Sequence, residues 1–238
     1  DCLKISLDKK EAQQVLDELE FKSLHLDLDS EEKEAVDISK NFVEITDLAE
    51  AQAWRQKAGK QRKLGIQLVA EAGELFGCGI CMPDGTAAFL KVQFCITADM
   101  VEAWMRELAD RVPEIYVVDL KPQLPWLYAE GSLPYADTGV AAYLLNPLES
   151  AYPYEMQARE YLDMELPSRA DLFGKTSFKD AQMLPDAMMK YACCSAYTAL
   201  FAGPVMAQKL KEEGMAALYQ DIELPLVYSL YRMEQAGI

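Results

Sequence analysis

The segment RKLGIQLVAEAGELFGCGICMPDGTAAFLKVQ, residues 62–93, decides the fold that the sequence predicts. It contains three short apolar runs separated by two turn signals, Glu71-Ala72-Gly73-Glu74 and Pro83-Asp84-Gly85. Apolar runs bounded by Gly, Pro and Asp are typical of strands in an antiparallel meander. The first run, Leu64–Ala70, is apolar on both faces except at Gln67, which is typical of a strand covered by helices on both sides. The segment therefore predicts the centre of an α/β layer.

Further elements are predicted on either side of this meander. A strand is expected over 41–45 and a helix over 47–58. After the meander we expect a helix capped by Asp99 with an apolar stripe (Val101, Trp104, Met105, Leu108), a buried strand over 115–118, and a helix from Asp137-Thr138 through Leu145. A long helix is expected from about Asp186, and a last helix over 215–236 contains Pro225 and ends at Gly237. Because a helix precedes the strand over 115–118, that strand is expected to run parallel to the first strand of the meander. Residues 150–185 are predicted to be irregular, and Gly203-Pro204 is predicted to kink or interrupt the long helix.

The N-terminal part of the chain carries a helix signal and then an acidic segment. Asp8 and Glu11 form a capping-box pattern ahead of an apolar stripe at helical spacing, whereas residues 27–37 hold six carboxylates and one Lys. The acidic segment is interpreted as a solvated linker.

The composition limits the possible functions. The 238 residues carry a net charge of −16, which argues against autonomous, nonspecific binding of nucleic acid, although a local basic patch stays possible. The sequence has no signal peptide and no apolar run long enough to span a bilayer, so a cytoplasmic location is expected. Because it begins at Asp1 and not at Met, an excised fragment or a processed chain is expected.

The cysteine and histidine content disfavours redox and triad chemistry. The six cysteines are at positions 2, 78, 81, 95, 193 and 194, mostly within apolar segments, and are predicted to be reduced core residues. Cys78 and Cys81 lie three apart in a predicted strand, so their thiols should point to opposite faces. With His25 as the only histidine, a Ser-His or Cys-His triad is improbable. No glycine loop of the Walker or dinucleotide type is present.

Three carboxylates could support metal-assisted phosphodiester chemistry. Two-metal sites need several carboxylates that converge from different elements, and Glu71, Asp119 and Asp137 are the available candidates. None of them has a carboxylate partner two residues along a strand, which is the simplest way to share one face.

Three stretches resemble the bacterial DNA polymerase I family (family A DNA polymerases). They are GTAAFLKV at 85–92, DTGVAAYLL at 137–145 and DIELPLVYSLYRMEQAGI at 221–238, of which the last is similar to the junction between the 3′–5′ exonuclease-like and polymerase domains. Residues 18–24 are similar to the segment that leads out of the family's 5′-nuclease region. The resemblance implies an RNase H-like mixed β-sheet flanked by helices, with a linker over 1–39, an exonuclease-like domain over 40–213 and the start of the polymerase domain over 214–238.

The resemblance also locates the metal-binding positions of the active family members. Their Asp-x-Glu motif falls on Gln67 and Val69, their Asn-x3-Asp motif on Asp119 and Gln123, and their Tyr-x3-Asp motif on Tyr191 and Ser195. Every matching metal-binding carboxylate is therefore replaced, while Tyr191 is retained on the helix face it would share with Ser195.

These replacements predict a vestigial, catalytically silent exonuclease domain that acts as a structural scaffold in DNA replication and repair. No catalytic residue, metal or cofactor is expected in the fragment, and Mg²⁺ is expected only for the parent polymerase. The implied partners are the polymerase and 5′-nuclease domains of the same parent chain and, through them, DNA; no membrane is expected. Two alternatives stay open: an active 3′–5′ exonuclease with relocated ligands (Asp119, Glu71, Asp137) and Tyr191 orienting the water, or an unrelated acidic interaction module.

Overall fold

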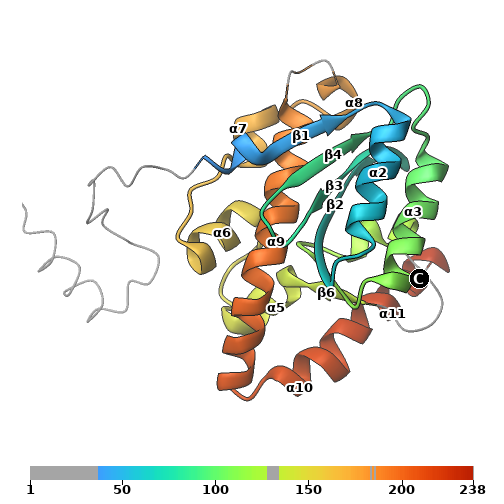
Figure 1. Cartoon of the computed structure of the whole chain (residues 1–238). Helices are drawn as coiled ribbons and strands as arrows, with labels where there is room; N and C mark the ends of the chain where they lie inside the picture. Colours follow the sequence, from blue (N-terminus) through green and yellow to red (C-terminus); the bar gives the residue numbers. More distant parts are fainter. Residues whose placement is uncertain (1–36, 128–133, 183, 185, 238) are drawn as a thin grey trace, which may run out of the picture. The chain divides into compact units, whose positions relative to one another are not determined.

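A six-stranded mixed sheet forms the centre of the molecule (Figure 1). The computed structural model describes residues 37–127, 134–182, 184 and 186–237, and Asp37–Ile238 form one compact unit. The strands are β1 (Phe42–Ile45), β2 (Lys63–Glu71), β3 (Glu74–Cys81), β4 (Ala87–Lys91), β5 (Glu114–Val117) and β6 (Tyr135–Asp137), in the order β1-β4-β3-β2-β5-β6. Strands β2, β3 and β4 pair antiparallel, as the turn signals predict, whereas β1 pairs with β4, and β5 with β2 and β6, in parallel. The predicted meander and the predicted α/β class are confirmed.

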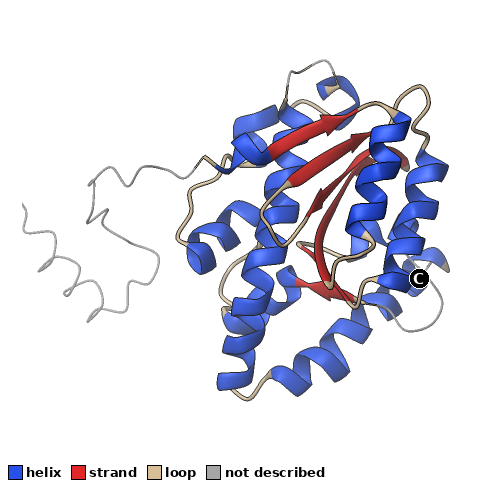
Figure 2. Cartoon of the chain, viewed as in Figure 1, coloured by secondary structure: helices blue, strands red, loops and turns tan. Residues whose placement is uncertain are grey.

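Helices cover both faces of this sheet (Figure 2). The helical elements are η1 (Ile38–Asn41), α2 (Leu48–Ala58), α3 (Ala98–Arg111), η2 (Lys121–Gln123), α4 (Leu124–Leu127), α5 (Thr138–Leu145), α6 (Tyr154–Leu162), α7 (Arg169–Phe173), α8 (Phe178–Ala181), α9 (Ala187–Glu212), α10 (Ala216–Leu218), a π-helical turn η3 (Tyr219–Glu223) and α11 (Leu224–Gln235). One apolar cluster joins the sheet to α2, α3 and α4, and a second joins it to α9. Strand β2 contributes side chains to both clusters, because successive side chains of a strand point to opposite faces. Leu64, Ile66 and Leu68 lie in the first cluster and Val69 lies in the second.

Helix α9 lies directly on the sheet because two strand glycines leave room for its backbone. A Cβ atom at Gly65 of β2 would come within 1.9 Å of the Ala196 carbonyl oxygen, and one at Gly79 of β3 within 2.5 Å of the Ala192 carbonyl oxygen. Real Cβ atoms do not approach so closely, so this packing requires glycine at both positions. The close contact fixes how far α9 reaches over β2, where the candidate site lies.

Several helix ends agree with the sequence and one differs. Asp47 caps α2 and Asp137 caps α5, each accepting a hydrogen bond from a backbone N–H of the first turn. Helix α3, in contrast, begins earlier than predicted: its N-cap is Thr97, whose side chain accepts from Met100 N, and Asp99 lies inside the first turn. Asp99 is favourable there because a carboxylate complements the positive end of the helix dipole.

Two further predictions are corrected by the structure, which also contains a strand that was not predicted. Residues 150–185 contain α6, α7 and α8 and so are not wholly irregular, because good helix formers follow Pro153 and a capping box joins Ser168 to Asp171. Helix α9 runs through Gly203-Pro204, so the predicted interruption of the helix there is wrong. Strand β6 was not predicted, because its three residues are too few to show a strand pattern and the last of them, Asp137, is the N-cap of α5.

The C-terminal helical run agrees with the prediction and accommodates its proline. The π-helical turn η3 precedes Pro225, which lies in the first turn of α11, and Gly237 follows in the left-handed conformation. A proline in the first turn of a helix has no N–H to leave unpaired. Within the described part of the chain, no helix is both long and apolar enough to cross a bilayer.

The cysteine predictions are confirmed with one exception. Cys78 lies in the first apolar cluster and Cys81 in the second, hence on opposite faces of β3, and Cys193 and Cys194 are buried. Cys95 is exposed, because it lies in a tight turn closed by the Gln93–Ile96 bridge and not in the core. Cys2, His25, the predicted helix behind Asp8 and the acidic segment up to residue 36 lie outside the described residues.

Candidate functional site

A cleft opens where strands β2 and β5 separate. The two strands pair only from Lys63–Gly65 to Glu114–Tyr116, and beyond that point β2 continues without β5 beside it. The cleft has a volume of about 320 Å³ and is lined by residues of β2, the segment after β5, α6, α7 and α9: Gln67, Val118, Asp119, Pro122, Ala151, Tyr152, Pro153, Tyr154, Glu155, Arg169, Tyr191 and Ser195. Ligands of open α/β sheets commonly bind in such a crevice at the carboxyl ends of the strands.

Four of the residues singled out by the sequence meet in this cleft. Gln67, Asp119, Tyr191 and Ser195 all line it, and the predicted shared face of Tyr191 and Ser195 on α9 is confirmed. The amide nitrogen of Gln67 donates to the Leu68 carbonyl oxygen at 2.8 Å. Ser195 Oγ is buried and has no hydrogen-bond partner among the described residues. Gln67 and Ser195 therefore contribute neutral polar groups to the cleft, which charged side chains also line.

Two other matched positions serve the interior of the protein. Val69 is fully buried in the apolar cluster under α9. Gln123 turns into the protein, where its carbonyl oxygen accepts from Leu68 N at 2.7 Å and its amide nitrogen donates to the Asp119 carbonyl oxygen at 2.6 Å. Gln123 thus satisfies a backbone N–H of β2 at the level where β5 has diverged, and it connects β2 to the segment that follows β5.

The three carboxylates of the relocated-site alternative do not all lie together. Asp119 and Asp137 both line a shallow opening beside α5, which Glu223 also lines. Glu71 lies elsewhere: its carboxylate accepts from Phe178 N at 2.9 Å and lies 3.9 Å from the Arg169 guanidinium, so it anchors α8. Among the described residues, no group of three or more His, Cys, Asp or Glu side chains is placed to hold a metal ion.

Asp137 is the most perturbed carboxyl group of this region. It is 2% exposed, and its two oxygens accept from Leu120 N at 2.9 Å and Val140 N at 3.0 Å. Burial raises the pKa of Asp137 to about 7, against the opposing effect of these N–H donors. At the mouth of the cleft, desolvation by the surrounding walls also raises the pKa of Asp119, although its side chain is exposed and Lys121 opposes the shift.

An aromatic cluster holds the retained tyrosine in place. The Tyr191 ring lies 5.7 Å from the rings of Tyr154 and Phe173 and 5.3 Å from that of Phe178. Arg169 stacks over Phe178 at 4.8 Å from the ring centroid. Sequence reasoning missed Tyr154 and Arg169, because both lie in the segment predicted to be irregular. The Ser168-x-x-Asp171 capping box was the signal that could have placed Arg169 at the start of a helix.

The comparisons with known proteins agree on the fold. No family model matches the chain and no curated relative was found. The structure is similar to that of the POL domain of Pol1 from M. smegmatis (20% identity, TM-score 0.61), where the match covers 80% of this chain and 31% of that chain. It is also similar to Brucella melitensis NrnC (15% identity, TM-score 0.58, 82% of this chain and 93% of that chain) and to the catalytic core of RRP6 from Trypanosoma brucei (13% identity, TM-score 0.57, 78% of this chain and 52% of that chain).

These similarities, together with the mixed sheet flanked by helices, establish the fold class that the sequence predicts. At such low identity they concern the fold alone. The chain has the α/β, RNase H-like exonuclease fold.

Proposed function

We propose that this chain is the exonuclease-like domain of a DNA polymerase of the DNA polymerase I type, that it no longer cleaves DNA, and that it acts in the cytoplasm as a scaffold for the polymerase domain in replication and repair. One observation carries the proposal: the positions that the resemblance equates with metal ligands hold Gln67, Val69, Gln123 and Ser195, and none of these side chains carries a charge.

The chemistry of these side chains supports a silent site. Mg²⁺ and Mn²⁺ prefer carboxylate oxygens, whereas Val69 offers no ligand atom and Ser195 only a neutral hydroxyl. The oxygen and nitrogen atoms of the Gln123 amide are both committed to backbone partners. The site residues thus take part in packing and in backbone hydrogen bonding. No metal or cofactor is proposed for the fragment, and Mg²⁺ is proposed only for the polymerase domain.

The C-terminal helical run supports the scaffold role. Its inner face, with Val227 and the partly buried Leu224 and Tyr228, packs on the first apolar cluster. Its outer face carries an exposed apolar stripe of Ile222, Leu226, Leu230 and Met233, which are 57%, 44%, 40% and 45% exposed. A helix that is apolar on both faces is typical of one buried between two bodies. We infer that the polymerase domain of the parent chain covers the outer stripe.

The decisive experiment is a calorimetric titration of Mn²⁺ into the purified chain, with thermal melts at matched metal concentrations and a cleavage assay on single-stranded DNA. We expect no saturable heat, no rise in melting temperature and no cleavage, because a metal that binds only the folded state must raise its stability. Saturable binding that is lost in Asp119→Ala, together with metal-dependent cleavage, would overturn the proposal.

The scaffold interface has its own test in a longer chain that includes the polymerase domain. Amide exchange over 222–233 should be slower there than in this chain, and Leu226→Ser should lower the melting temperature of the longer chain only. Val227→Ser, on the inner face, should destabilise both chains. Equal effects of Leu226→Ser in the two chains would contradict the assignment of the outer stripe.

A further inference from the structure

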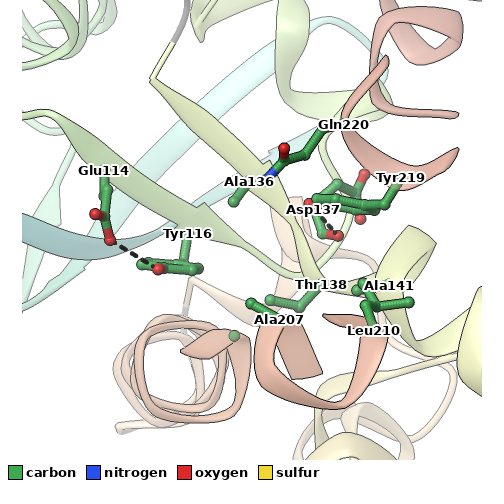
Figure 3. Close-up of a pocket in the computed structure, with 11 residues that line it drawn as sticks. Glu114, Tyr116, Ala136, Asp137, Thr138, Ala141, Ala207, Leu210, Tyr219 and Gln220 are labelled. Carbon is green, nitrogen blue, oxygen red and sulfur yellow. Dashed lines mark hydrogen bonds between the residues drawn. The ribbon is translucent and has the colours of Figure 1, made fainter. Parts of the chain in front are cut away.

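A further cavity borders Asp137, and neither the resemblance nor the proposed function uses it (Figure 3). It has a volume of about 310 Å³, is lined by residues of β5, β6, α5, α9 and the π-helical turn, and opens to solvent beside the exposed residues Glu114, Ala207 and Gln220. Small side chains open its floor, because Gly203 and Ala207 of α9 and Ala141 of α5 leave the space that larger residues would fill. Gly203 also allows the Tyr116 ring to lie flat against α9, since a Cβ there would come within 2.3 Å of Tyr116 Cδ1.

The polar groups of this cavity are hydrogen-bond acceptors or neutral. Glu114 lies at one side of it and Asp137 at the other, with the Tyr116 ring between them (Figure 3). Neither Lys, Arg nor His is among the described residues that line it. Glu114 accepts a hydrogen bond from Tyr116 OH at 2.8 Å and forms no ion pair with another described residue.

The aromatic groups complete the chemical character of the cavity. Tyr116 and Tyr219 both line it, and the Tyr219 hydroxyl donates to the Asp137 carbonyl oxygen at 3.1 Å, which fixes that ring at the wall. Tyrosine faces attract cations that approach the ring. An apolar cavity with a few convergent polar groups is the usual form of a small-molecule site.

We propose that this cavity binds a small organic ammonium ion with an apolar body, its charged group on the Glu114 carboxylate and its apolar part between Tyr116, Tyr219 and the small residues of α9. Anions are disfavoured, because the described lining offers them two carboxylates and no basic side chain. The apolar walls favour an organic cation over a bare metal ion, because a metal ion would lose its hydration without receiving enough oxygen ligands.

The test compares three ligands of nearly equal shape and different charge: 2-phenylethylamine, 2-phenylethanol and phenylacetate. Binding to the full chain is followed by amide chemical shifts in about 150 mM salt, which screens general attraction to the acidic surface. We expect saturable shifts around Glu114, Tyr116 and Gln220 with the amine, at least tenfold weaker binding of the alcohol, and none of the phenylacetate.

Two variants and two matched controls locate the site. Glu114→Gln should weaken amine binding at least tenfold and Ala207→Leu, which fills the cavity, should abolish it. Glu149→Gln and Ala217→Leu change exposed residues outside the cavity and should bind like the unmodified chain. Equal affinity for amine and alcohol, shifts scattered over the whole surface, or unchanged binding in Ala207→Leu would each overturn the proposal.

Discussion

Replacing Gln123 by glutamate tests whether this position now stabilises the fold. Gln123 is 4% exposed, and its amide both accepts from Leu68 N and donates to the Asp119 carbonyl oxygen. An ionised glutamate keeps the acceptor for Leu68 N but faces the Asp119 carbonyl oxygen with a second acceptor, where the amide nitrogen now lies at 2.6 Å. A protonated glutamate can donate to that oxygen and so resembles the glutamine.

The magnitude follows from linkage. Burial and the facing carbonyl oxygen should raise the pKa of the introduced carboxyl group in the folded state by about 2–4 units, and each unit corresponds to about 1.4 kcal/mol. Because the folded pKa lies above the unfolded one, Gln123→Glu should be nearly as stable as the unmodified chain near pH 4. It should lose about 3–5 kcal/mol relative to that chain as the pH rises through the folded pKa.

Urea unfolding at several pH values measures this difference, with the unmodified chain as reference at each pH. Gln52→Glu, an exposed change on α2, is the matched control and should show almost no pH-dependent difference. Gln123→Met removes both hydrogen bonds without adding a charge, so its loss of stability should not vary with pH. If Gln123→Glu is as stable as the unmodified chain at pH 7.5, the inward hydrogen bonds of Gln123 do not carry the stability assigned to them here.

Three further predictions concern other parts of the structure. Gly203→Ala should lower the free energy of unfolding by about 1–3 kcal/mol, because the added methyl group overpacks against Tyr116. In a Tyr116→Leu background the same change should raise it by up to about 1 kcal/mol through helix propensity, and equal effects of Gly203→Ala in the two backgrounds in urea unfolding would contradict this coupling. Because the folded pKa of Asp137 is raised to about 7, its contribution to stability should decrease as the pH rises from about 4 to 7, and Asp137→Asn should remove that slope from the urea midpoints. In a Cys2→Ser background, Cys95→Ser should eliminate the fast reaction with a thiol reagent, since burial raises the pKa of the four other described thiols; a fast phase that persists would place another thiol at the surface.

The sequence was sufficient for the elements with a strong local pattern. The meander could be predicted because Ala72-Gly73 and Gly85 have positive φ angles, which the turn signals anticipated. Strand β6 could not, since its three residues gain their strand conformation from pairing with β5 and carry no pattern of their own. Helix α9 likewise continues through Gly203-Pro204, two residues of low helix propensity, at a point where Gly203 packs closely against Tyr116.

The candidate cleft was predictable in part for a similar reason. Helical spacing placed Tyr191 and Ser195 on one face of α9, and both line the cleft. The inward turn of Gln123 depends on where β5 leaves β2, which no local pattern specifies. The cavity between Glu114 and Asp137 could not be predicted from local patterns, because β5, the β6–α5 segment and the end of α9 with the π-helical turn come together only in the fold.

On the proposed function, neutral residues at the matched positions would let the domain stay folded at any metal concentration. Clustered carboxylates repel one another, and a bound cation normally offsets that repulsion. Here Val69 adds apolar packing under α9, Gln123 links β2 to the segment after β5, and Ser195 is neutral. If these residues stand in for metal-binding carboxylates, as proposed above, each leaves out one charge at a position of low solvent access, and we expect the cleft to need no cation for its stability. The proposed scaffold role would benefit from this independence, because the melting temperature would then depend on the packing of the domain and on the polymerase domain that we infer covers the outer stripe.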